Sequence, residues 1–153
     1  MSRRTADRGF TLVESVVVAA LVAITLLVAV SLVQERLQSA RARVAADQLS
    51  VDLRLARLTA VSRRSAVDVV ITAHPTNSYR LTDSRGRTRT VLMPRGVRIV
   101  SSTSPIVFRA NGTVSGGAST VLETDVSRRT VERYTINTGL LGVPRIDHER
   151  TQP

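Results

Sequence analysis

The chain has 153 residues, contains no cysteine and carries a formal net charge of +10 at pH 7. This length allows one small folded domain beside a membrane segment, and the lack of cysteine excludes disulfides, thiolate metal sites and lipid-modified cysteines. All 22 basic residues are arginine, and their excess over acidic residues predicts attraction to nucleic acid, anionic lipid or cell-surface polymers.

The N-terminus combines a short basic leader with a long apolar run. The motif Gly9-Phe10-Thr11-Leu12-Val13-Glu14 opens a stretch that has no further charge as far as Val33. Residues 15–33 are long enough to cross about 30 Å of hydrocarbon as a helix. A carboxylate at the edge of such a segment costs on the order of 2–3 kcal/mol to insert, so we expect Glu14 to have a compensating role.

A single helix is predicted from Phe10 to about Ser62, because no Gly or Pro interrupts residues 10–74. Beyond Gln34 the pattern becomes amphipathic, with one apolar stripe made of Leu37, Ala40, Val44, Val51, Leu55 and Leu58. Part of this stripe repeats every seven residues, which is the spacing of a coiled-coil seam. We favour the alternative, in which the stripe packs against the protein's own sheet.

After Arg64 the periodicity changes to that of strands separated by turns. The predicted strands are Val67–Ile71, Tyr79–Asp83, Arg87–Met93, Val97–Val100, Pro105–Arg109, Ser119–Thr124 and Thr130–Ile136. A helix followed by short antiparallel strands indicates an α+β fold. We therefore expect five segments: a leader (1–9), a transmembrane or filament-core half-helix (10–33), an amphipathic half-helix (34–64), a β domain (65–146) and a flexible tail (147–153).

Two parts of the sequence resemble one family. The motif Gly9–Glu14 with its basic leader resembles the processing site of type IV pilins and type II secretion pseudopilins. The stretch Ile106-Val107-Phe108, Asn111-Gly112 and Gly116-Gly117, with the later Tyr134–Gly139, resembles the GspH/FimT minor pseudopilin domain. This resemblance implies a long N-terminal helix packed on antiparallel sheet.

The resemblance also implies how the N-terminus is used. A prepilin peptidase would cut between Gly9 and Phe10 on the cytoplasmic side and methylate the new amine of Phe10. Glu14 would pair with the N-terminal amine of a neighbouring subunit and set the register of assembly, and Thr11, Leu12 and Val13 complete the motif. The chain would thus be a single-pass inner-membrane protein with a cytoplasmic N-terminus. It would then join other pilin subunits in a type II secretion pseudopilus or a type IV pilus.

Two alternatives stay open. One is a DNA-binding minor pilin of a DNA-uptake filament, whose candidate phosphate contacts are Arg80, Arg85, Arg87 and Arg89 around a predicted hairpin. DNA-binding members carry a Gly-Arg-x-Arg-like element near the C-terminus. Here the stretch Gly139-Leu140-Leu141-Gly142-Val143-Pro144-Arg145 lacks the first arginine, so this role does not carry over by motif. The other alternative is a single-pass signal-anchored protein unrelated to filaments.

The sequence offers no enzyme site. It contains no compatible Ser-His-Asp or Cys-His set and no glycine-rich phosphate loop after a strand. His74 and His148 are each isolated from a second metal ligand, so neither predicts a zinc site. We expect no cofactor, no metal and no catalysis.

Overall fold

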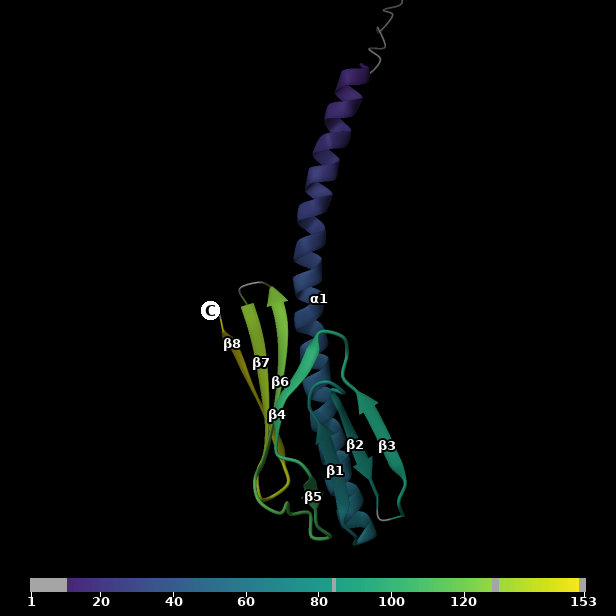
Figure 1. The fold of residues 1–153 in the computed structure, drawn as a ribbon, viewed down its shortest axis with the longest axis vertical. Coiled ribbons are helices and arrows are strands. Elements are labelled where there is room, and N and C mark those ends of the chain that lie inside the picture. Colours follow the sequence, from purple (N-terminus) through teal and green to yellow (C-terminus); the bar gives the residue numbers. More distant parts are fainter. Residues whose placement is uncertain (1–10, 84, 128–129, 152–153) are drawn as a thin grey trace, which may run out of the picture. The chain divides into compact units, whose positions relative to one another are not determined.

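The computed structural model describes residues 11–83, 85–127 and 130–151. These residues form one long helix, α1 (Leu12–Arg63), followed by eight strands (Figure 1). The chain divides into two compact units, residues 1–34 and residues 35–153. The first contributes the N-terminal part of α1, and the second holds the rest of α1 and the strands. The predicted α+β class is confirmed.

The C-terminal end of α1 is closed by a Schellman motif. Arg64 has a φ of 50°, its N–H donates to the carbonyl of Val61 at 3.2 Å, and the N–H of Ser65 donates to the carbonyl of Ala60 at 3.1 Å. Such a motif usually places glycine at the left-handed position, because a Cβ is disfavoured there. An arginine fills that position here, so α1 ends one residue after the predicted end without the usual glycine signal.

The sequence predicts a membrane-spanning segment at residues 10–33. Among the residues that the structure describes, no helix combines the length and the apolar character of a membrane span. This assignment is not confirmed and stays a prediction.

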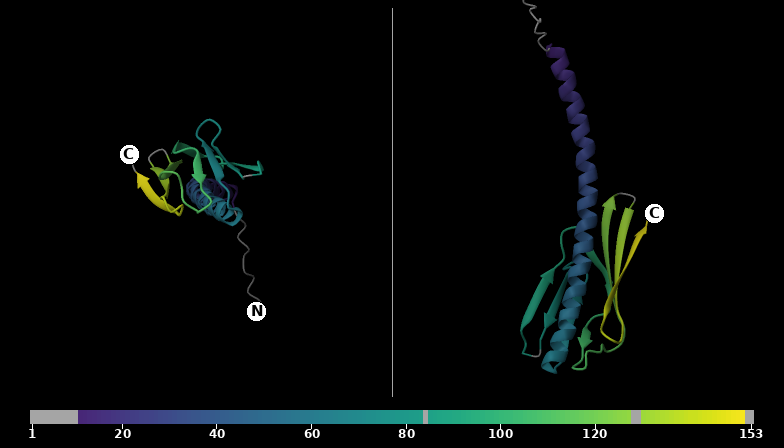
Figure 2. Two further views of the ribbon diagram at one scale, coloured as in Figure 1. Left: turned by 90° about the horizontal axis from the view of Figure 1, so that it is seen from below. Right: turned by 180° about the vertical axis from the view of Figure 1, so that it is seen from behind.

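The strands form two antiparallel four-stranded sheets. The first has the order β3-β2-β1-β5 and consists of β1 (Val67–Thr72), β2 (Ser78–Thr82), β3 (Thr88–Leu92) and β5 (Ile106–Phe108). The second has the order β4-β6-β7-β8 and consists of β4 (Val97–Ser102), β6 (Ala118–Ser127), β7 (Thr130–Thr138) and β8 (Pro144–Thr151). Figure 2 shows the two sheets on either flank of the helix segment that belongs to the same unit.

The core lies where both sheets meet the inner face of α1. The helix contributes mainly small side chains to it, namely Ala42, Ala45, Ala46, Ala56 and Ala60, together with Leu49 and Leu53. The strands contribute larger ones, including Val69, Tyr79, Ile99, Ile106, Phe108, Leu122 and Ile136. Small residues on the helix let the two sheets approach its backbone closely, and the strand side chains fill the remaining space.

The predicted orientation of the amphipathic half-helix is wrong. The stripe that contains Leu37, Val44, Val51 and Leu58 is exposed, and the alanine-rich face is buried instead. Periodicity identifies helix faces, but residue size misleads here, because most of the side chains that this helix buries between the two sheets are alanines. The exposed stripe with its seven-residue repeat is left without a partner inside the described part of the chain.

The C-terminal tail also differs from the prediction. The sequence predicts a flexible tail at residues 147–153, whereas β8 runs from Pro144 to Thr151 and pairs with β7 along its length. Residues 152–153 lie outside the described residues. Its outer half consists of charged and polar side chains, which give little apolar signal. The strand is held by ladder hydrogen bonds to a well-buried neighbour, and these depend weakly on side-chain type.

Replacing a leucine on each face of α1 by alanine tests this orientation. Leu49 is 0 % exposed and Leu58 is 62 % exposed. We expect Leu49→Ala to lower the free energy of unfolding by about 2–5 kcal/mol, because it leaves a cavity. The matched variant Leu58→Ala should change it by less than about 0.5 kcal/mol. Urea unfolding of the full chain in detergent measures both values, and equal losses would contradict the observed orientation.

Candidate functional site

The processing motif lies at the start of α1. Gly9 and Phe10, the predicted cleavage and methylation residues, are outside the described residues. Thr11 caps the helix, because its Oγ1 accepts a hydrogen bond from the backbone N–H of Glu14 at 3.2 Å. The spacing Thr-x-x-Glu is that of a capping box, a signal that could have been found in the sequence. The cap fixes the first turn, which carries Leu12, Val13 and Glu14.

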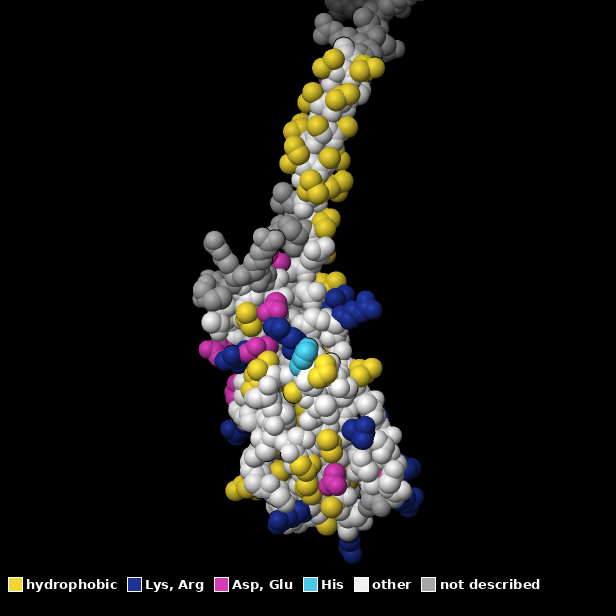
Figure 3. Space-filling model, viewed as in Figure 1, with side chains coloured by type: hydrophobic (Ala, Val, Ile, Leu, Met, Phe, Trp, Pro, Cys, Tyr) yellow, Lys and Arg dark blue, Asp and Glu magenta, His cyan; other side chains and the backbone are white. Residues whose placement is uncertain are grey.

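The part of α1 in the first unit exposes apolar side chains all around its axis. Leu12, Ile24 and Leu27 are among the most exposed. Figure 3 shows hydrophobic side chains along the visible face of this segment. A helix that is apolar all round is stable when other apolar material surrounds it. Over the described residues these apolar side chains stay exposed, so their burial would require other apolar material around the helix.

A buried carboxylate on α1 links the helix to the first sheet. Asp52 is 2 % exposed. It accepts hydrogen bonds from the Tyr79 hydroxyl on β2 at 2.5 Å and from Gln48 Nε2 at 3.2 Å, and Arg89 Nη1 on β3 lies 3.4 Å from it. A buried charge is tolerated when it is paired and hydrogen-bonded in this way.

A second buried carboxylate links the other sheet to the helix. Glu132 on β7 is 3 % exposed. Its Oε2 accepts hydrogen bonds from Ser39 Oγ on α1 at 2.8 Å and from the Tyr134 hydroxyl at 3.4 Å. His148 on β8 stacks on the Tyr134 ring, with centroids 4.5 Å apart, and its Nε2 lies 3.9 Å from Glu132. His148 is thus a packing partner of Tyr134.

Sequence analysis singled out neither Asp52 nor Glu132. Each is an acidic residue in an arginine-rich chain, and acidic residues in such a chain are usually exposed to solvent. The one available signal was position, because Asp52 lies at helical spacing with the apolar Leu49 and Ala56, and Glu132 lies two residues before Tyr134 on a strand. Their role in this structure is to attach one sheet each to α1.

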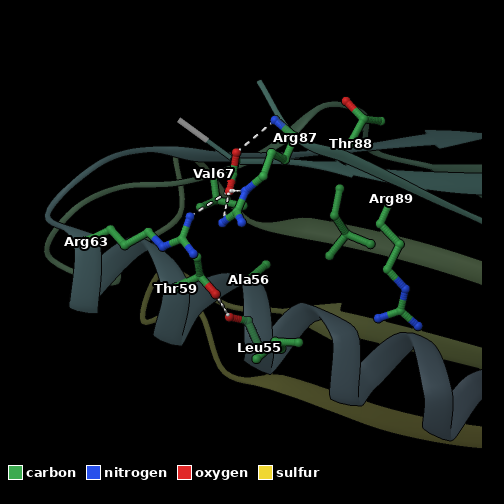
Figure 4. Close-up of a pocket in the computed structure, with 10 residues that line it drawn as sticks. Leu55, Ala56, Thr59, Arg63, Val67, Arg87, Thr88 and Arg89 are labelled. Atoms are coloured by element: carbon green, nitrogen blue, oxygen red, sulfur yellow. Dashed lines mark hydrogen bonds and ion pairs between the residues drawn. The ribbon is translucent and has the colours of Figure 1, made fainter. Parts of the chain in front are cut away.

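A third acidic residue organises the end of the β2–β3 hairpin. Asp83 forms ion pairs with Arg63 of α1 at 2.6 Å and with Arg87 at 2.8 Å. Desolvation raises the pKa of Asp83, but hydrogen bonds from Arg87, Arg63 and the Arg85 backbone outweigh it and hold the pKa at about 2. Arg63, Asp83 and Arg87 line a hollow of about 380 Å³, together with Leu55 and Val67 (Figure 4).

The four candidate phosphate contacts do not all lie on one face of the first sheet. In the β2–β3 ladder Arg89 faces Leu81, whereas Arg80 faces Thr90. Because side chains alternate along a strand, Arg80 and Arg89 lie on opposite faces. Arg89 is paired with Asp52, and Arg87 is paired with Asp83. Arg80 therefore does not share a face with Arg89, and phosphate binding by these four arginines stays a prediction.

Two parts of the chain match known protein families. Residues 45–139 match the family described as type II transport protein GspH. The chain belongs to the GspH family. Residues 4–30 match the prokaryotic N-terminal methylation motif, at the place where the GspH-family chain carries Gly9–Glu14. The resemblance noted in the sequence is confirmed. No curated protein sequence matches the chain.

The fold of this GspH-family chain is similar to that of a solved minor pilin. The type IV minor pilin FimU of Pseudomonas aeruginosa, in a crystal of space group P21, superimposes with a TM-score of 0.51 at 18% identity, covering 71% of this chain and 87% of FimU. FimU in space group P65 gives a TM-score of 0.49 at 19% identity, covering 70% of this chain and 91% of FimU. At this identity the likeness concerns the fold alone.

The hydrogen bond between Tyr79 and the buried Asp52 of the GspH-family chain can be tested by replacing the tyrosine. Tyr79→Phe should lower the free energy of unfolding by about 1.5–3 kcal/mol, because a hydrogen bond to a buried carboxylate is lost. Burial, and then the hydrogen bond to Asp52, raise the pKa of Tyr79. The folded state therefore holds this proton more tightly than the unfolded state, whose tyrosine pKa is about 10. Stability should fall as the pH rises above about 10, and less steeply in Tyr79→Phe.

Thermal unfolding between pH 8 and 11 measures this effect, and Tyr134→Phe is the matched control. Its hydroxyl makes a longer hydrogen bond, 3.4 Å, so its loss should be smaller. Equal losses for the two variants, or an unchanged alkaline slope in Tyr79→Phe, would speak against the assignment.

Proposed function

We propose that this protein is a minor pilin or pseudopilin subunit that works by assembly. Prepilin peptidase cleaves it after Gly9 and methylates Phe10, and the mature chain joins a filament through α1. The observation that carries the proposal is the methylation motif at the head of a helix whose apolar side chains are exposed. The family description names type II transport and FimU is a type IV minor pilin, so the proposal includes both kinds of filament.

Glu14 sets the register of assembly in this proposal. After cleavage the new N-terminal amine belongs to Phe10, four positions before Glu14 in the sequence, and the amine of a neighbouring subunit can pair with the Glu14 carboxylate. Apolar surroundings strengthen the attraction between the two charges. They also penalise a subunit that enters in the wrong register and leaves a charge unpaired. Before assembly the apolar segment holds the chain in the cytoplasmic membrane, with the N-terminus in the cytoplasm.

The exposed stripe of α1 supports assembly along a second part of the helix. Leu37, Val44, Val51 and Leu58 recur every seven residues and are all exposed. This spacing suits packing against another helix, because it keeps one seam facing the partner over several turns. The stripe is thus a contact surface for helices of neighbouring subunits.

The state of the N-terminus tests the proposal directly. Mass spectrometry of chain isolated from producing cells should find a mature form that starts at methylated Phe10. The variant Glu14→Ala should be cleaved in the same way, yet enter sheared filaments far less than the wild type, because its register contact is lost. A chain that keeps residues 1–9 in cells with a working peptidase would overturn the proposal. Normal incorporation of Glu14→Ala would remove the register role alone.

The stripe makes a separate prediction. The double variant Val44→Ser/Val51→Ser should reduce incorporation into filaments about tenfold, which corresponds to about 1.4 kcal/mol of lost contact energy. Its leader cleavage and thermal unfolding should stay as in the wild type, because both side chains are exposed. Leu92→Ser, which changes an equally exposed residue on β3, is the control. Quantitative immunoblotting of sheared filaments compares the variants, and equal incorporation by all three chains would exclude the stripe.

A further inference from the structure

The connection between β7 and β8 exposes an unusual cluster of apolar side chains. We call residues 139–143 the leucine turn. Leu140 is 64 % exposed and Leu141 is 73 % exposed, and Val143 beside them is also exposed. Single exposed apolar residues are ordinary on protein surfaces, but contiguous groups of them mark interaction sites.

The leucine turn is built into the fold. The carbonyl of Leu140 accepts a hydrogen bond from the N–H of Val114 at 3.0 Å, and the Gly142 N–H donates to the Gly139 carbonyl at 2.8 Å. Gly142 has a φ of +69°, and a Cβ there would lie 2.5 Å from the carbonyl oxygen of Gly112. The backbone can therefore take this path only with glycine, which fixes the turn against its neighbour.

An arginine of α1 locks the same loops to the helix. Arg57 Nε donates to the Gly112 carbonyl at 3.1 Å, and the Arg57 side chain also lies against Gly142. The leucines are thus exposed because an anchored turn presents them, at no cost in ordering a loose loop when a partner binds.

Two adjoining hollows flank the leucine turn and share Val143. One measures about 320 Å³ and is lined by Arg54, Arg57, Leu58, Gly142 and Val143. The other measures about 370 Å³ and is lined by Asn137, Gly139, Leu140, Leu141, Val143 and Arg145. The lining of the two hollows therefore combines apolar side chains with the guanidinium groups of Arg54, Arg57 and Arg145. Over the described ranges, Arg54 and Arg145 form no ion pair.

We propose that the leucine turn, together with Leu58, is a docking surface for an apolar segment flanked by carboxylates on a different pilin subunit. The inference rests on the proposed function, because that function supplies the class of partner. The floor matches apolar side chains, and Arg54 and Arg145 match the flanking carboxylates. A second copy of this chain fits less well, because its own net charge is +10.

Binding between full-length subunits in detergent tests this surface. The probes are the other methylation-motif subunits of the same bacterium, each purified at full length and titrated against the wild-type chain. We expect at least one to bind with an affinity that falls as the salt concentration rises. The double variant Leu140→Ser/Leu141→Ser should weaken that binding at least about tenfold, as expected for exposed apolar anchors. Arg145→Gln should reduce the salt dependence.

The control is Leu92→Ser, which should bind within about twofold of the wild type, and circular dichroism checks that each variant unfolds at the wild-type temperature. Undiminished binding by the double variant, a lack of binding to every probe, or association only between copies of this chain would each overturn the proposal. Failure of the proposed function is a different result, since an unprocessed N-terminus is detected by mass spectrometry whether or not the turn binds.

Discussion

The short side chains on the inner face of α1 set the distance between the helix and both sheets, and much of the structure follows from that distance. The small side chains of Ala46 and Ala56 let the strands lie close to the helix backbone. The approach is close enough for Tyr79 to reach Asp52, and for Ser39 to reach Glu132. Each sheet is therefore held by apolar packing and by one buried acid, whose pairing requires the correct docking geometry.

The same constraint decides what the helix shows to its surroundings. Alanines occupy most of the inner face of α1, so several larger apolar residues of the helix lie on its outer face. Val44 and Val51 are among them, and their apolar side chains are exposed to water in the isolated chain. This arrangement separates two tasks on one element: the inner face holds the domain together, and the outer face is free for contacts with other chains.

The sequence was sufficient for the helix, for the positions of most strands and for the processing motif, because these depend on local periodicity and punctuation. It was insufficient where long-range packing decides. The burial of Asp52 depends on Tyr79, which lies on a strand after the helix has ended, so its environment has no local signature. Likewise, β8 is stabilised by its pairing with β7, and its charged residues gave no hint of it. The register of the β2–β3 ladder places Arg80 and Arg89 on opposite faces, and the pairing of Arg89 with Asp52 depends on a contact between strand and helix.

The placement of the tyrosines has a practical consequence. The chain contains two Tyr and no Trp, and each tyrosine lies at the buried acid of a different sheet. Ultraviolet emission of the protein therefore originates from the two contacts that hold the sheets to the helix. With one tyrosine changed to phenylalanine, the remaining fluorophore would monitor the release of a single sheet, and the two halves of the β domain could be followed separately without any attached dye.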